Sequence, residues 1–413
     1  HFIRIQAERS SVNRAEEIGM DGELCGCEVA AENLGGVVHR IGCFMRRYSD
    51  VFQRREQVEN AKLVIRGLLS HLERKSLEPI AELHEVPRRA IQNFVGAGLW
   101  DDERLDEVLR SHVVERWGAP ESVLVLDPST FPKSGKDSVG VARQWCGRLG
   151  KIDNCQKGVF LAYASPQGSI AVDRRLYLPD EWADDPIRRE KCHVPSGVGF
   201  ETGLQIALEM IETCRWMPHS FIAGDDEFGR SADFRAQLAA KEERYILDVP
   251  SNTLVREAGR KWQPITKWAA SKGSQVWHRC LVRDGHRGPL YVDAMSGRVE
   301  TRMPDGSARW ERALVMKNIE GDEPRMSFGL SNSGPDVRLS ELVRAACARH
   351  EIEEVFAKAK GEVGMAHYEV RSWVGWHHHM SLCMLSLWFL EIERERLGGK
   401  ITSHHGSSGG VCD

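Results

Sequence analysis

The N-terminal part of the chain carries apolar side chains at the spacing of amphipathic helices. The clearest example is residues 57–73, whose apolar positions predict one long helix. Residues 79–95 predict a shorter helix, a turn at Val86-Pro87 and a second helix that starts at Arg88 and Arg89. This rhythm is typical of a helix-turn-helix, in which the two arginines would face DNA phosphates. Two helices that simply pack together would show the same pattern.

From residue 121 onward the pattern changes to short apolar runs that predict β-strands. The expected strands are residues 122–127, 138–147, 158–165, 169–178, 219–225 and 244–249. Helices at residues 200–216 and 231–243 separate the last of them, so that helices and strands alternate there. A run of strands followed by such alternation predicts an α/β domain built on a mixed sheet.

The alternation stops after residue 250, where the chain becomes polar, glycine-rich and short-stranded. Residues 251–325 therefore predict an all-β insertion with hairpin turns at Asp284-Gly285 and Asp305-Gly306. Residues 326–334 predict a return strand, and residues 339–397 predict mostly helix.

These patterns divide the chain into six expected segments. Residues 1–19 precede the first methionine, Met20, and are expected to be read-through or added sequence, whereas residues 398–413 are expected to form a disordered tail. The segments between them are a helical region that would bind DNA (20–118), the first part of the α/β core (119–250), the β-rich insertion (251–325) and the second part of the core (326–397).

The charge balance limits how the protein could bind nucleic acid. Lys and Arg number 56 against 60 Asp and Glu, a net charge of −4, which excludes a uniformly basic protein. Any contact with DNA must therefore come from local patches. One candidate patch includes Lys133, Lys136 and Arg143 around the first expected hairpins. These side chains would either follow a DNA backbone or simply face solvent.

The remaining composition favours a protein of the cytoplasm. The longest apolar run, residues 380–390, has about half the length needed to cross a bilayer, so we expect a buried helix and no membrane contact. The 11 cysteines are odd in number and scattered, which indicates reduced thiols rather than a disulfide framework.

Two aspartates follow apolar strands. Asp127 ends the strand of residues 122–127, and Asp225 ends the strand of residues 219–225. The carboxyl ends of strands in an open α/β sheet are where such proteins hold ligands. Two carboxylates brought together there would repel each other unless a cation were bound. Taken alone, an aspartate after a strand is more often a turn or helix N-cap residue.

A third acid lies on the helix expected around residues 349–360. Arg349, Glu353 and Lys360 are spaced four and seven residues apart, which puts them on one helix face. A separate apolar stripe would let the helix pack while Glu353 stays at its edge. The alternative is a solvated face stabilised by ion pairs between neighbouring turns.

Arg349, Glu353 and Lys360 match the Tyr-x2-Arg-x3-Glu-x6-Lys signature of IS4-like DDE transposases, although Ala346 stands at the tyrosine position. Longer segments resemble the IS701 group of that superfamily over about residues 60–395. They are LVLDPSTFPKSGKDSVGVARQWCGRLGKIDNCQKGVFLAYASPQG, DRRLYLPDEWADDP, GDDEFGR and AKGEVGMAHYEVRSWVGWHHHMSL.

The resemblance implies an RNase H-like catalytic core, a mixed five-stranded sheet with helices, interrupted by the β-rich insertion. It implies that Asp127, Asp225 and Glu353 form the DDE triad and bind metal. Asp225 is chosen over Asp226 because the family places the acid four residues before the glycine matched by Gly229. The resemblance also implies that Arg349 and Lys360 hold DNA phosphates near the metal, where arginine can engage two oxygens.

The chemistry explains these residue types. Two divalent cations about 3.5–4 Å apart can activate the attacking oxygen and stabilise the leaving one in phosphodiester cleavage. Carboxylate oxygens suit Mg2+, so we expect two Mg2+ ions per active site, with Mn2+ as a substitute.

The implied function is that of a DNA transposase. It would bind terminal inverted repeats, hydrolyse the transposon end and transfer the freed 3′-hydroxyl into target DNA, as a homodimer or larger synaptic complex near the nucleoid. The alternatives are a domesticated or inactive DNA-binding relative and a Mg2+-dependent nuclease that takes no part in transposition.

Overall fold

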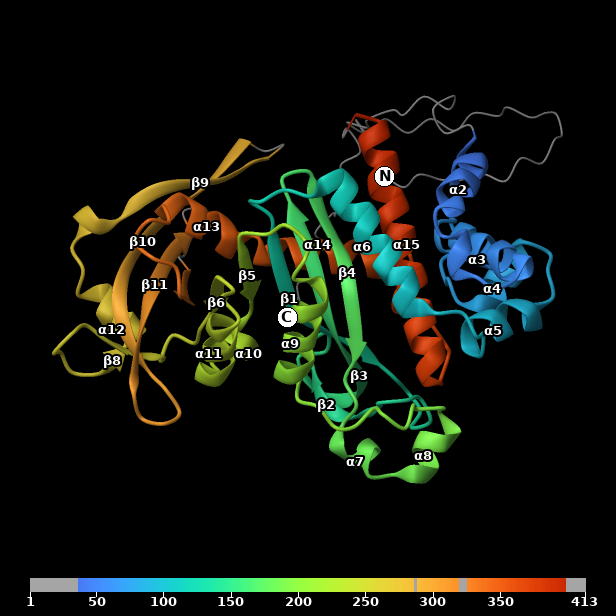
Figure 1. The fold of residues 1–413 in the computed structure, drawn as a ribbon, viewed down its shortest axis with the longest axis horizontal. Helices are drawn as coiled ribbons and strands as arrows, with labels where there is room; N and C mark the ends of the chain where they lie inside the picture. The colour runs from blue at the N-terminus through green and yellow to red at the C-terminus, as the bar shows by residue number, and fades with distance from the viewer. Residues whose placement is uncertain (1–35, 286–287, 319–324, 399–413) are drawn as a thin grey trace, which may run out of the picture. The chain divides into compact units, whose positions relative to one another are not determined.

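The computed structural model describes residues 36–285, 288–318 and 325–398 (Figure 1). The segment expected to be read-through or added sequence lies outside these ranges, as does the expected tail from residue 399 onward. The chain divides into two compact units. Among the described residues, the helical unit comprises 36–108, 358–370 and 378–398, and the sheet unit comprises those within 109–357 and 371–377.

The helical unit is built from short amphipathic helices. They are α2 (Val37–Arg46), the 3-10 helix η1 (Ser49–Val51), α3 (Arg55–Leu68), α4 (Leu77–Leu83), α5 (Arg88–Gly96), the first residues of α6 (Asp102–Trp117) and most of α15 (Trp373–Arg396). Helix α3 starts where the side chain of Gln57 accepts a hydrogen bond from the backbone N–H of Arg54 (3.2 Å). A side chain at Gly67 would overlap Ile80, so this glycine lets α3 and α4 approach closely.

Helices α4 and α5 reproduce the predicted pair of helices, with the turn at residues 84–87. Glu85 adopts a positive φ of 54°, which turns the chain between them. Ile80, Ile91 and Phe94 are buried. Arg88 and Arg89 remain exposed at the start of α5. The two-helix prediction is therefore confirmed, and its role in DNA binding is taken up below.

Helix α15 contains the apolar run of residues 380–390, and nearly all of that run is buried, as the sequence predicted. In the helical unit, both ring nitrogens of His378 lie 3.0 Å from backbone carbonyl oxygens, those of Val95 and Trp100. Within the described parts of the chain, no helix has the length and hydropathy of a membrane span.

The sheet unit contains one twelve-stranded sheet, with the strand order β2-β3-β1-β5-β6-β12-β11-β10-β7-β8 and with β4 and β9 paired to β3 and β10. Its strands are β1 (Val123–Pro132), β2 (Ala142–Cys146), β3 (Lys151–Ser165), β4 (Gly168–Leu176), β5 (Phe221–Gly224), β6 (Tyr245–Asp248), β7 (Leu254–Arg256), β8 (Gln263–Pro264), β9 (His278–Gly285), β10 (Gly288–Arg302), β11 (Ala308–Asn318) and β12 (Met326–Ser331). The fold is thus α/β with a mixed sheet, as predicted.

Five neighbouring strands correspond to the expected core. Strands β4, β3 and β1 are antiparallel, and β1, β5 and β6 are parallel. This arrangement is consistent with a DDE nuclease fold. The sheet itself is not five-stranded, because β12 pairs antiparallel with β6 and continues it into β11 and β10.

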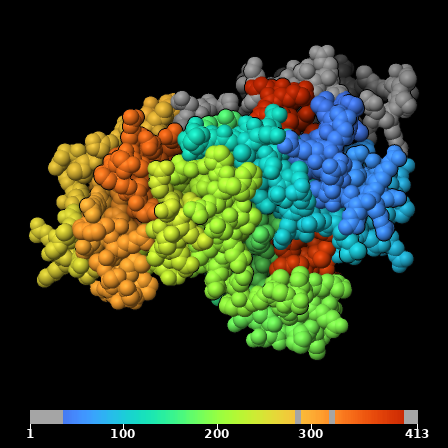
Figure 2. All heavy atoms as spheres, viewed as in Figure 1, coloured from blue at the N-terminus to red at the C-terminus, as the bar shows by residue number. Residues whose placement is uncertain are grey.

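The insertion is not all β, which corrects the prediction. It contains helix α12 (Ile265–Ala270) and the 3-10 helix η2 (Ser274–Val276). Trp268 of α12 is buried against Val299 and Phe328 of the sheet, so the apolar face of this short helix fills the core of the insertion. The insertion and helices α10 and α11 form one continuous surface (Figure 2).

The predicted turn at Asp305-Gly306 joins β10 to β11. Gly306 has a φ of 82°, and the side chain of Asp305 accepts a hydrogen bond from the backbone N–H of Ser307 (2.9 Å). The other predicted turn, at Asp284-Gly285, lies at the end of β9, where Gly285 is paired with Gly288.

Helices of the sheet unit connect or flank the strands. They are α7 (Asp180–Ala183), α8 (Pro186–Lys191), α9 (Gly203–Cys214), α10 (Asp226–Gly229), α11 (Ala232–Ala240), α13 (Leu339–Cys347) and the first residues of α14 (Arg349–Gly361). Helix α10 is a single turn that directly follows β5, and α14 carries the third expected acid.

Candidate active site

The strand register aligns three aspartates on neighbouring central strands of the sheet. Leu126 of β1 is paired with Gly224 of β5, and Gly224 is paired with Leu247 of β6. The residues that follow these three are Asp127, Asp225 and Asp248. The aspartates therefore occupy the same level on three adjacent parallel strands. Strands β5 and β6 end at this level, whereas β1 continues to Pro132, so the expectation that this strand ends at Asp127 is corrected. Neighbouring strands are about 4.8 Å apart, which sets the backbone spacing between Asp127 and Asp225.

Asp225 is oriented by the helix that follows it. Its side chain is the N-cap of α10 and accepts a hydrogen bond from the backbone N–H of Glu227 (2.9 Å). Burial raises the pKa of Asp225 above its usual value, and the negative charge of Glu227 raises it further. The carboxylate is thus held in one place at an electrostatic cost, which a bound cation would relieve.

Gly229 explains the four-residue spacing from Asp225. A Cβ at this position would collide with the backbone carbonyl oxygen of Asp248. Only glycine lets α10 pass this close to the end of β6. The carbonyl oxygen of Gly229 also accepts a hydrogen bond from the guanidinium of Arg235, which fixes the end of the short helix.

Helix α14 reaches the row of aspartates through Arg349. The Nε atom of Arg349 lies 2.8 Å from Oδ2 of Asp248, and its Nη1 atom lies 3.6 Å from Oε1 of Glu353. One guanidinium therefore stands between the end of β6 and the third expected acid. The Nε–Asp248 contact is an ion pair without hydrogen-bond geometry, because the buried Nε has no hydrogen-bond partner.

Asp248 has the most perturbed carboxylate of the group. Its pKa is raised to about 6, first because of burial. Arg349 lowers the pKa, whereas Asp225, Asp226 and Glu353 raise it. Three other carboxylates thus act on Asp248 against a single guanidinium, so negative charge is in excess around it.

The structure aligns two of the expected acids, Asp127 and Asp225, on neighbouring strands. The third, Glu353, contacts Arg349, which pairs with Asp248 and not with either expected aspartate. The side chain of Glu353 is 59% exposed. In the ranges that the structure describes, no group of three or more His, Cys, Asp or Glu side chains is arranged to hold a metal ion.

The basic residues expected to bind phosphate lie in several places. Lys133 and Lys136 follow the end of β1, and Arg143 is exposed on β2. Lys360 is half-buried and belongs to the helical unit. In the same unit, Arg88 forms an ion pair with Glu78. Arg89 is exposed beside it.

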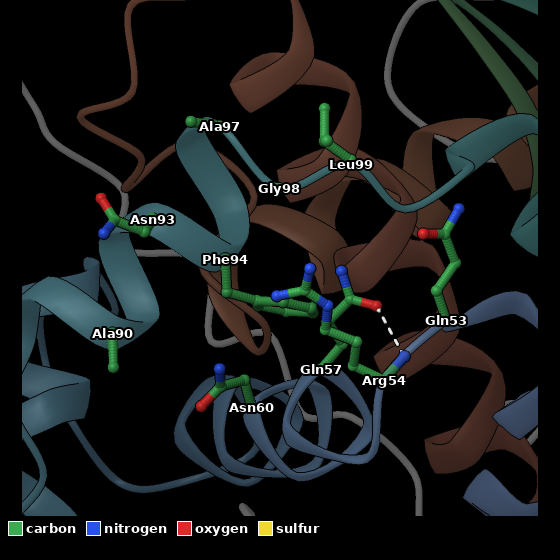
Figure 3. A pocket seen from close by; sticks show the side chains of 10 residues that line it. All are labelled: Gln53, Arg54, Gln57, Asn60, Ala90, Asn93, Phe94, Ala97, Gly98 and Leu99. Carbon is green, nitrogen blue, oxygen red and sulfur yellow. Dashed lines mark hydrogen bonds between the residues drawn. The ribbon is translucent and has the colours of Figure 1, made fainter.

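A pocket of about 290 Å³ lies in the helical unit between α3 and α5 (Figure 3). Gln57 and Asn60 line it from α3, and Asn93 and Phe94 line it from α5. Most of the polar groups are side-chain amides, which both donate and accept hydrogen bonds. The pocket contains none of the expected acids and is a separate feature of the helical unit.

Sequence reasoning missed Asp248. The signal was present, because RYILDV has the same form as the runs that end at Asp127 and Asp225: an apolar strand followed by an acid. What the sequence could not provide was the register that places all three acids at one level.

These features agree with the comparison to known families. Residues 47–289 match the family described as DDE superfamily endonuclease, and the chain belongs to this family. Nucleases of this family generally depend on divalent metal ions.

One curated relative makes the similarity more specific. The chain is 25% identical over 230 residues to a "Probable transposase for insertion sequence element IS701" from Microchaete diplosiphon. The match covers 54% of this chain and 56% of the relative, so the chain spans about half the length of that protein. The predicted resemblance to the IS701 group is confirmed.

Proposed function

We propose that this protein is a DDE transposase. It binds transposon ends, hydrolyses a phosphodiester bond there and transfers the freed 3′-hydroxyl into target DNA. The observation that carries the proposal is the alignment of Asp127 and Asp225 on adjacent parallel strands in a DDE superfamily endonuclease. The similarity to an IS701 transposase supports transposition over an unrelated nuclease activity.

In this proposal Asp127, Asp225 and Glu353 are the catalytic acids. Asp225 is held in place by the backbone of α10, so its carboxylate needs little reorganisation when substrate binds. Arg349 and Lys360 bind phosphate oxygens of the DNA strand. Arginine is suited to this role because its planar guanidinium can donate to two oxygens at once.

The donor set fits a hard divalent cation, because the aligned side chains offer carboxylate oxygens and no sulfur or imidazole. Asp127 and Asp225 would hold Mg2+ or Mn2+, and Glu353 would complete the set after its carboxylate turns away from Arg349. Two bound ions would stabilise the negative charge that develops on the phosphate. The excess of negatively charged carboxylates around Arg349 is the feature of this chain that a bound cation would neutralise.

The exposed face of α5 is proposed to read the transposon end. Arg89, Gln92 and Asn93 are exposed on this helix, which follows the turn of a two-helix motif. Arginine recognises guanine and side-chain amides recognise adenine in the major groove. The amides of Gln57 and Asn60 face α5 across the pocket and extend the polar surface. Lys133, Lys136 and Arg143 provide further phosphate contacts from the sheet unit.

Transposition joins two DNA ends in one event, so the active form is proposed to be a homodimer or a larger synaptic complex. The working location is the nucleoid, where both the element and its targets lie.

The direct test incubates the purified protein with DNA that carries the element's ends, in the presence of Mg2+ or of EDTA. We expect nicking at the end and joining to a target plasmid in Mg2+ only. An Asp225→Ala variant, assayed under the same conditions, is the control that lacks the second proposed catalytic acid. Equal products from both proteins would rule out the assignment of Asp225, and binding without any cleavage would favour an inactive relative.

A second test concerns the helical unit. Arg89→Ala is expected to weaken binding of end DNA about five- to tenfold and to reduce the salt dependence of binding by about one unit. Glu82→Ala, at an exposed position on α4, is the control that should not weaken binding. Unchanged affinity in the Arg89 variant would remove α5 from the DNA interface.

A further inference from the structure

We propose that Asp248 is a positioning residue that competes with Glu353 for Arg349 and so lets the third acid turn toward the metal. This inference rests on the proposed transposase function. It assigns a role to Asp248, which is not one of the three expected catalytic acids. Asp248 acts through Arg349 and does not itself touch the DNA.

The first support is the rigidity of Asp248. It is the last residue of β6, and its backbone is fixed on both sides of the strand. On one side Gly329 of β12 is its partner in the ladder, and on the other Gly229 of α10 packs against its carbonyl group. A carboxylate on such a rigid backbone position can hold the guanidinium of Arg349 more precisely than a carboxylate on a flexible loop.

The second support is the competition for Arg349. Its guanidinium has two carboxylates within reach, that of Asp248 at 2.8 Å and that of Glu353 at 3.6 Å. Arg349 and Glu353 are four residues apart on one helix, a spacing at which such pairs form readily. Without Asp248, the guanidinium would close on Glu353 and neutralise the acid that must join the other two.

The third support is the geometry of the contact. The ion pair leaves the buried Nε of Arg349 without a hydrogen bond, so Asp248 holds the guanidinium by charge and not by a directional bond. The guanidinium can then turn toward a phosphate without breaking a directional bond to Asp248. A fully hydrogen-bonded Arg349 would have to break those bonds first.

The test is a double-mutant cycle of Asp248→Ala and Arg349→Ala, read by single-turnover cleavage of end DNA in Mg2+. We expect Asp248→Ala to lower the rate about tenfold to a hundredfold, with affinity for end DNA unchanged within about twofold. In the Arg349→Ala background, the same change at Asp248 should cause no further loss, because nothing remains for Asp248 to hold. Asp248→Asn, which keeps the size of the side chain but removes its charge, should lose as much as Asp248→Ala.

The matched control is Glu243→Ala. Glu243 lies just before the other end of β6 and pairs with Nε of Arg215 at 3.0 Å, but it is remote from the row of acids. After folding is verified by circular dichroism, this variant should cleave like the wild type. A rate loss of the same size would mean that damage to β6 explains the effect, and the proposal would be overturned.

Two other outcomes are decisive. Additive losses in the cycle would show that Asp248 acts independently of Arg349, which contradicts the proposal while leaving the transposase assignment intact. A wild-type protein that binds the ends but does not cut them in Mg2+ would instead remove the proposed function, and the role of Asp248 with it.

Discussion

Two arginine–carboxylate clusters adjoin strand β6, and they differ in their charge balance. At the carboxyl end, Arg349 faces the acids Asp225, Asp248 and Glu353 and remains partly exposed. Near the start of the strand, the side chains of Arg235 and Glu311 are 4% and 1% exposed and form an ion pair at 2.9 Å.

The buried cluster is complete within itself. Glu311 also accepts hydrogen bonds from the hydroxyl groups of Tyr245 and Thr301, and Arg235 donates to the carbonyl oxygen of Gly229. Each charge has a partner, so the cluster joins the core to the insertion without needing a ligand. The cluster around Arg349 has acids to spare and one buried N–H unsatisfied. The two clusters thus differ in whether each charge has a partner, and the unbalanced one is the proposed binding site.

The largest effect is expected from Asp225→Asn. Asparagine can still cap α10, so folding should be retained, but the negative charge that would hold the cation is lost. We expect the rate of end cleavage to fall on the order of 10⁴-fold. Asp226→Asn is the control, because Asp226 pairs with Arg230 at the surface, and it should stay within about threefold of the wild type. If the Asp225 variant still cleaved DNA, the excess negative charge around Arg349 would have no role in catalysis.

The buried cluster should respond in stability. Glu311→Ala leaves Arg235 charged and unpaired in the interior, so we expect a loss of about 3–5 kcal/mol in the free energy of unfolding, measured with urea. Replacing Glu311 and Arg235 together by Leu and Met should recover most of that loss. A loss below about 1 kcal/mol in the single variant would contradict the view that this cluster is structural.

Gly229→Ala tests the link between the two clusters. The added Cβ must displace the end of β6 or helix α10, because it would meet the carbonyl oxygen of Asp248. We expect a loss of about 2 kcal/mol in stability together with slower cleavage. Gly147→Ala is the control, since nothing lies within 4 Å of a Cβ at that position. Equal behaviour of the two variants would show that the close approach is unnecessary.

The smallest effect concerns pH. The pKa of Asp248 is about 6 in the folded protein, well above its ordinary value, so the folded state binds this proton more tightly than the unfolded state. Below about pH 4 the carboxyl is protonated in both states and has no effect. As pH rises toward 6 the wild type loses stability, and above 6 the loss is constant.

The measurement compares wild type with Asp248→Asn by urea unfolding from pH 4 to 8 in EDTA. The variant should become the more stable protein by about 1–2 kcal/mol above pH 6, after allowance for solvent screening of the partly exposed carboxylate. A difference of the opposite sign would show that Arg349 fully compensates for the neighbouring acids. A stable but slow variant would be typical of a residue kept for function at a cost in stability.

Much of this arrangement could be predicted from local sequence. Short apolar runs define the strands because a buried strand needs continuous apolar side chains. The acids that follow those runs are visible in the sequence, and so is the two-helix motif at α4 and α5. The insertion was predicted as all β because its sequence is polar and glycine-rich and contains no long helical pattern. Helix α12 is short, and its apolar face is recognised only from the packing of Trp268 in the core.

The sequence by itself determined the class of fold, the apolar runs that lead into Asp127 and Asp225, and the helix that carries Arg349 and Glu353, because these depend on periodicity and short spacings. The tertiary structure alone decided that β12 extends the sheet past β6 and that Asp248 stands level with the other aspartates and faces Arg349. Those relations join Asp248 to residues as far away in the sequence as Asp127, Gly329 and Arg349. Strand register and packing determine these contacts. A local sequence pattern does not show which charged residue, distant in the sequence, will lie beside a given side chain.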